Sequence, residues 1–135
     1  MIFEIYTKPI PKGRPRLGKC GAYTPPQTKF FENFVAINLR KQMMLNKHRI
    51  LTDLVCVSVI FDFKRSKSSM LLTPRPDVDN LLKSILDAMN GIVVVDDKNI
   101  YRVIGEKRWS DKDKITIEVA AAGKAGIEPT TASAL

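Results

Sequence analysis

Two pairs of aspartates have the residue types and spacing for metal-ion chemistry. Asp77 and Asp79 are one residue apart and stand directly before a segment with helical periodicity, whereas Asp96 and Asp97 are adjacent and follow a short apolar run. Mg²⁺ takes oxygen ligands, and proteins usually supply one or two carboxylates while water and phosphate oxygens fill the other positions. We expect the fold to bring the two pairs together into a magnesium site.

A purely structural interpretation of the same residues stays open. Asp77 or Asp79 can cap the helix that follows, because a carboxylate at that position accepts from free backbone N–H groups. The sequence Asp96-Asp97-Lys98-Asn99 has the composition of a solvated turn. On this interpretation neither pair holds a metal ion.

The segment between the pairs has the pattern of an amphipathic helix. Pro76 keeps the residue before it extended, and Gly91 stands where a helix usually ends. Asp77 and Asp79 therefore lie at the helix N-terminus, where the helix dipole favours negative charge. The residues 92–95 are all β-branched and predict a short extended segment. The predicted buried face of the helix comprises Val78, Leu81, Leu82, Ile85, Leu86 and Met89.

The rest of the chain predicts one α+β domain, in which a mixed β-sheet carries two main helices. Strands are expected at 2–6, 55–63, 100–109 and 115–119, the last two as a hairpin with its turn at 110–114. The other helix is expected to run from Thr24 to Leu45, with Thr24 and Gln27 as a capping box. Residues 1–122 form the predicted domain, and residues 123–135, rich in small side chains, form a C-terminal tail.

The charge balance indicates a polyanionic partner. The 135 residues include 22 Lys and Arg against 14 Asp and Glu, a formal net charge of +8, and such an excess is typical of nucleic-acid binding. Many of the cations lie in two loops, around residues 12–19 and 64–69. These loops either contact phosphate groups or are simply solvated. The predicted DNA contacts are Lys12, Arg14, Arg16, Lys19, Lys64, Arg65, Lys67 and Arg75.

Several classes of protein are excluded by what the sequence lacks. The two cysteines form no C-x-x-C pair, which argues against a zinc site or a disulfide framework and fits a reducing cytoplasm. No P-loop spacing is present, so no nucleotide cofactor is expected. No apolar run approaches the length of about 20 residues that a membrane span needs.

The acidic segment resembles the RusA family of Holliday junction resolvases. The matching residues are Asp77-Val78-Asp79-Asn80-Leu81-Leu82-Lys83, then Leu86-Asp87-Ala88-Met89-Asn90-Gly91, then Val95-Asp96-Asp97. The basic opening from Pro9 to Arg16 resembles that of phage-type members, so a phage or prophage origin is expected.

The resemblance implies a homodimeric, Mg²⁺-dependent endonuclease that resolves four-way DNA junctions by paired symmetric nicks in recombination and repair. It assigns metal binding to Asp77, Asp79 and Asp97, a supporting role to Asp96, and a catalytic role to Lys83. The number of magnesium ions does not follow from it. Two other functions stay open: a nucleic-acid-binding protein without enzymatic activity, and a nuclease that acts on other branched DNA.

Overall fold

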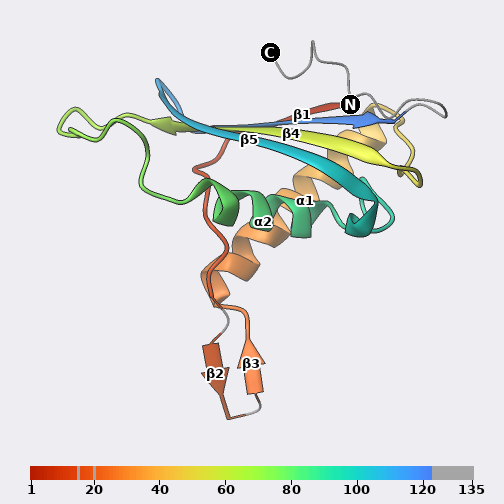
Figure 1. Cartoon of the computed structure of the whole chain (residues 1–135), viewed down its shortest axis with the longest axis horizontal. Coiled ribbons are helices and arrows are strands. Elements are labelled where there is room, and N and C mark those ends of the chain that lie inside the picture. The colour runs from red at the N-terminus through yellow and green to blue at the C-terminus, as the bar shows by residue number, and fades with distance from the viewer. Residues whose placement is uncertain (15, 20, 123–135) are drawn as a thin grey trace.

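The chain forms a four-stranded sheet with both long helices on one face, and a small hairpin that projects from this body (Figure 1). The computed structural model describes residues 1–14, 16–19 and 21–122, and the predicted tail at 123–135 lies outside these residues. Helix α1 spans Pro26–Leu45 and helix α2 spans Val78–Met89. The predicted α+β class, a mixed sheet carrying two helices in one domain, is confirmed.

The sheet is mixed because its strands run in the order β1-β6-β4-β5. Strand β4 (Val55–Lys64) pairs in parallel with β5 (Ile100–Ser110) and antiparallel with β6 (Lys114–Ala121), which also pairs with β1 (Ile2–Ile5). The predicted hairpin of the last two strands is therefore wrong, since β4 lies between them. Their short connection crosses two strand spacings, roughly 10 Å.

The core lies between the sheet and the helices because each element buries one face. Along β4, Val57, Val59 and Phe61 alternate toward the helices and are almost fully buried. Helix α2 buries Leu81 and Ile85 at the spacing that one helical face requires. A stripe of α1 residues four apart closes the other side of the core: Phe31, Val35, Leu39 and Met43.

Three local predictions need correction. Helix α1 begins after Pro25, with no side-chain cap from a described residue, so the predicted capping box is absent. The second half of the first basic loop forms strand β2 (Arg16–Gly18), which pairs antiparallel with β3 (Gly21–Tyr23) just beyond the loop. Residues 92–95 form a turn with isolated bridges instead of a strand, because Gly91 turns the chain with a φ of 81°.

Within the described residues no helix has the length and apolar character to cross a membrane.

Candidate active site

The carboxylates of Asp77 and Asp79 are exposed at the start of α2. Asp77 is the N-cap residue, with an extended φ and ψ of −69° and 135°, and Asp79 lies in the first turn. The Asp77 side chain accepts no capping hydrogen bond within the described part of the chain. Its oxygens are therefore not used to close the helix, as the structural interpretation would require, and they remain able to bind a ligand. The helix dipole favours the negative charge of both residues.

The chain that leads into Asp77 is anchored to the sheet by Lys107. The Lys107 Nζ donates hydrogen bonds to the carbonyl oxygens of Pro74, at 2.9 Å, and Pro76, at 2.8 Å. Lys107 is in register with Phe61, so it points from β5 toward the helices. The sequence interpretation placed Lys107 in a partly exposed strand and missed this role. The available signal was a lysine at an inward position of a β-strand, which needs polar partners.

Helix α2 packs closely against strand β5. Gly105 lies two residues before Lys107 on the same face of β5, and a Cβ atom added there would come within 2.6 Å of a Leu82 methyl group. The missing side chain thus lets α2 lie close against the strand. Lys107 and Gly105 together determine where the first turn of α2, with its two carboxylates, stands.

Asp96 and Asp97 belong to a turn beyond the other end of α2. Asp96 caps a short 3₁₀ helix, η1 (Asp97–Asn99), and its Oδ1 accepts a hydrogen bond from the Lys98 N–H at 3.0 Å. This hydrogen bond, with a smaller contribution from Asp97, lowers the pKa of Asp96 below its usual value. Asp96 therefore performs the turn-forming role of the structural interpretation, while Asp97 is exposed.

One chain does not unite the two pairs of aspartates. Helix α2 has twelve residues, and a rise of 1.5 Å per residue separates its ends by about 18 Å. Figure 1 shows the turn into β5 at the end of α2 that is remote from its start. Oxygens that share one Mg²⁺ lie within about 4 Å of each other. The described residues contain no group of three or more His, Cys, Asp or Glu side chains placed to hold a metal ion. The three aspartates of a single chain therefore do not fit one ion.

Lys83 lies near the first pair. It is exposed on α2, four residues beyond Asp79, and residues at this spacing share one side of a helix. Lys83 is the sixth of the twelve residues of α2, and because helical side chains lean toward the helix N-terminus, its side chain is directed toward the turn that carries Asp79.

Lys12, a predicted DNA contact, is engaged within the protein. Its Nζ lies 2.8 Å from the Glu32 carboxylate on α1 and 3.0 Å from the Asp87 carboxylate on α2. Burial opposes the charged form of Lys12, but hydrogen bonds to both carboxylates outweigh it and raise the Lys12 pKa. Its charge is largely compensated, so its main effect is to tie the two helices together.

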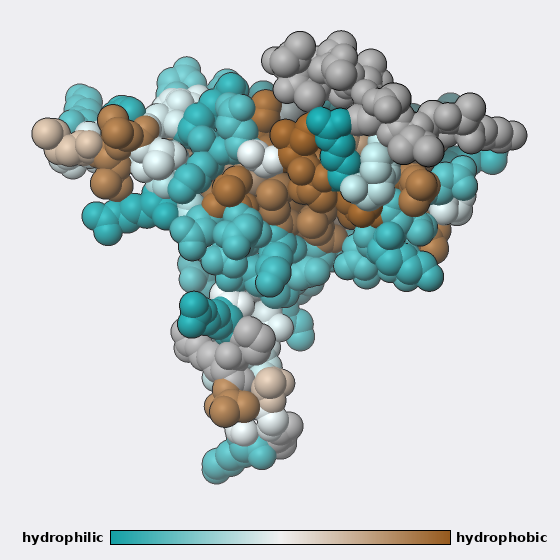
Figure 2. Space-filling view, in the orientation of Figure 1, coloured by the Kyte–Doolittle hydropathy of each residue, from teal (hydrophilic) through white to brown (hydrophobic). Residues whose placement is uncertain are grey.

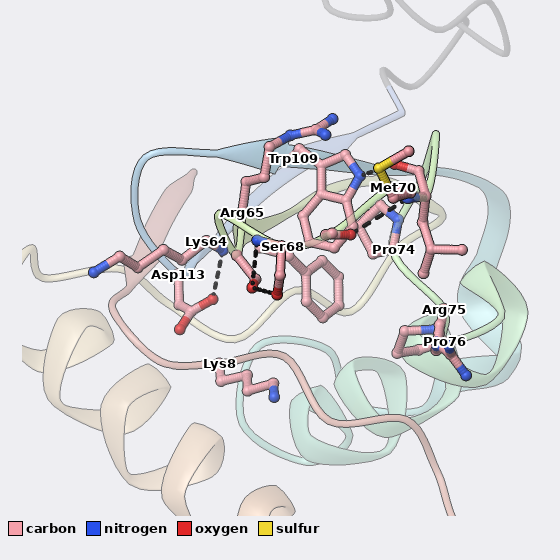
Figure 3. Close-up of a pocket in the computed structure, with 14 residues that line it drawn as sticks. Lys8, Lys64, Arg65, Ser68, Met70, Pro74, Arg75, Pro76, Trp109 and Asp113 are labelled. Atoms are coloured by element: carbon pink, nitrogen blue, oxygen red, sulfur yellow. Dashed lines mark hydrogen bonds between the residues drawn. The ribbon is translucent and has the colours of Figure 1, made fainter.

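The other predicted DNA contacts have different surroundings. Lys64, Arg65 and Arg75 line a cavity of about 870 Å³ that reaches Pro76, next to Asp77 (Figure 3). Arg14 borders a second cavity, of about 520 Å³. Lys19 and Lys67 are exposed, and the Arg16 side chain lies outside the described part.

Comparison with known proteins places this arrangement in a family. The chain matches the family model "Endodeoxyribonuclease RusA" over residues 7–120, which include both pairs of aspartates and Lys83. It is also similar to "Uncharacterized protein YqaN" of Bacillus subtilis (strain 168), with 28% identity over 138 aligned positions, covering 87% of this chain and 93% of that protein. The family match spans most of the sheet and both helices, and on this basis the chain belongs to the RusA family of endodeoxyribonucleases.

Proposed function

We propose that the protein is a Mg²⁺-dependent endonuclease that resolves four-way DNA junctions by paired nicks. The observation that carries the proposal is the exposed pair Asp77 and Asp79 at the start of α2, within a chain of the RusA endodeoxyribonuclease family. Pro76, the residue directly before Asp77, lines a cavity whose lining also includes four cations. A site for a metal ion and a phosphate needs this combination of anionic ligands and nearby positive charge.

We further propose that the metal site is completed by a second copy of the chain. Asp77 and Asp97 of one chain are separated by the length of α2, so Asp97 has to come from elsewhere to share an ion with Asp77. A symmetric dimer that packs two α2 helices in opposite directions places the end of one helix beside the start of the other. Such a dimer contains two equivalent sites, as paired cuts in a junction with two equivalent strands require.

An apolar surface between the two acidic ends supports this arrangement. Leu82 and Leu86 of α2 are only partly buried, and Val103 of β5 is 38% exposed. Figure 2 shows hydrophobic side chains gathered over the region where β5 lies against α2. A dimer interface in this region buries apolar surface. It also places the start of α2 in one chain beside the end of α2 in the other.

Each residue then has a defined role in the proposed enzyme. Asp77 and Asp79 of one chain and Asp97 of its partner hold the metal, and Asp96 holds the turn that presents Asp97. A bound Mg²⁺ supplies the positive charge that polarises the phosphate and activates water. Lys83 adds a cation beside the reacting phosphate. The phosphate contacts come from Arg14, Arg16, Lys19, Lys64, Arg65, Lys67 and Arg75.

The test compares cleavage with binding for the wild type and Asp77→Asn. Asparagine is nearly isosteric with aspartate and caps helices about as well, so folding should persist. We expect nicking of a synthetic four-way junction to require Mg²⁺ and to fall by orders of magnitude in Asp77→Asn, while junction binding and the melting temperature change little. Near wild-type nicking by Asp77→Asn would contradict the proposed site. Matched duplex and forked DNA show whether junctions are the preferred substrate.

A further inference from the structure

The large cavity beside Asp77 combines apolar walls with a cationic rim. It has a volume of about 870 Å³ and is lined by the end of β4, the connection from β4 to α2, and Trp109 of β5. Cavities of about 300 to 1,000 Å³ are typical of sites for small organic molecules. Figure 3 shows Trp109 on one side, Lys8 across from it, and Arg75 and Pro76 toward the start of α2.

The charge on this cavity is strongly positive. Four cations line it, Lys8, Lys64, Arg65 and Arg75, and none of them has an ion-pair partner among the described residues. The one acid in the lining is Asp113, whose Oδ1 accepts a hydrogen bond from the Lys64 backbone N–H at 2.8 Å. Uncompensated cations around an apolar space favour a ligand that has both negative charge and a flat apolar part.

Trp109 provides a stacking surface within the cavity. Its indole N–H donates a hydrogen bond to the Leu71 carbonyl oxygen at 3.0 Å, which holds the edge of the ring against the β4–α2 connection. The Arg65 guanidinium lies over the ring, 5.1 Å from its centre. Guanidinium groups and nucleobases are both planar and both stack on an indole. A face of Trp109 that accepts Arg65 can therefore accept a base.

The cavity lies next to the start of the proposed metal site. Arg75 and Pro76 line the cavity, and the next residue is Asp77. If the phosphate to be cut lies at Asp77, a base next to it in the strand is therefore close to this space. Lys107, which binds Pro74 and Pro76, keeps the cavity and the carboxylates in a fixed relation.

We propose that this cavity binds one unstacked nucleobase of the strand to be cut, stacked on Trp109, while Arg65 moves from the ring to a flanking phosphate. The proposal rests on the proposed nuclease function and adds a basis for its substrate choice. Bases inside a continuous duplex are stacked on both sides, and extruding one is costly, whereas a branch point offers an unstacked base at lower cost. Trp109 is then a specificity-determining residue for branched DNA.

The test uses the fluorescence of Trp109, which is the single tryptophan of the chain. The full-length protein is titrated, in buffer with EDTA to prevent cutting, with a four-way junction and with a duplex of the same sequence. We expect the junction to quench Trp109 as the base stacks, while the duplex at saturation leaves the emission nearly unchanged. Equal quenching by both DNAs, or none by the junction, would overturn the proposal. A change in Trp109 emission that depends on the protein concentration and not on the added DNA would indicate that the cavity binds another protein molecule. That result would also overturn the proposal.

Variants extend the test to affinity. Trp109→Leu should weaken junction binding roughly 5- to 150-fold, the range for the loss of one base–aromatic stack, with little effect on duplex binding. Trp109→Phe keeps an aromatic face and should retain most of the affinity. Phe30→Leu is the matched control, because Phe30 is 76% exposed on α1 and does not line the cavity. An equal loss of junction and duplex binding in Trp109→Leu would refute the subsite. Because no measurement here requires cutting, an absence of nuclease activity with selective quenching would reject the proposed enzyme and leave the base-binding site in place.

Discussion

Mixed dimers of two inactive variants should recover activity if the metal site is shared between chains. One variant carries Asp77→Asn and the other Asp97→Asn, and each alone has both sites broken. In a dimer of one chain of each kind, one site has lost both residues and the other retains Asp77 from one chain and Asp97 from its partner. If each chain instead formed its own site, both sites in the mixed dimer would stay broken.

The expected magnitude follows from the geometry and from counting. The length of α2, about 18 Å for twelve residues, exceeds the distance of about 4 Å between oxygens that share a magnesium ion, so one chain has no route to a complete site. Random pairing of equal amounts makes half of the dimers mixed, each with one intact site of two. About a quarter of all sites are then intact, and initial nicking should reach about a quarter of the wild-type rate.

The assay is cleavage of a supercoiled plasmid with an extruded cruciform by chains that are co-expressed with different tags. A mixed dimer with one working site should produce nicked circles, since a single cut does not resolve the junction. The control pairs Asp77→Asn with Asp79→Asn, which leaves every site lacking one carboxylate at the start of α2 and should stay inactive. A mixture of Asp77→Asn and Asp97→Asn that is no more active than this control would refute the shared site.

Three further predictions concern residues that hold α2 and the chain before it in place. Lys107→Gln should reduce nicking roughly 10- to 100-fold through misplacement of Asp77, while junction binding measured by anisotropy is retained and Lys107→Arg restores part of the rate. Gly105→Ala should lower the free energy of unfolding by about 1–3 kcal/mol through overpacking against Leu82, as measured by urea denaturation, and a loss no smaller in the presence of Leu82→Ala would argue against this contact. Lys12→Gln should cost about 1 kcal/mol at neutral pH through the loss of a partly exposed ion-pair network. Because folding raises the Lys12 pKa above 10.5, its stabilisation is complete below that pH and is lost as the pH rises through the folded-state value; a difference from wild type that persists undiminished at higher pH would contradict this cause.

The amino-acid sequence by itself determines the local elements of this protein. Helix α2 follows from apolar residues at helical spacing between Pro76 and Gly91, and the structure begins and ends it at nearly the predicted positions. Strand β4 follows in the same way from its alternation. A helix or a strand depends mainly on residues that are close in the sequence, so the periodicity of apolar residues is enough to predict it. The acidic motif that relates the chain to its family can likewise be recognised along the sequence.

The tertiary structure alone decides how these elements meet. The insertion of β4 between β5 and β6 depends on strands far apart in the sequence, and no alternation of side chains reports which strand will be the neighbour. The same is true of Lys107, whose partners are carbonyl groups 31 and 33 residues away. The separation of Asp77 from Asp97 has a simpler origin. A stretch of helix between two acidic pairs keeps them apart by its length, and residues of the same chain bring them together only if the chain folds back, which here it does not.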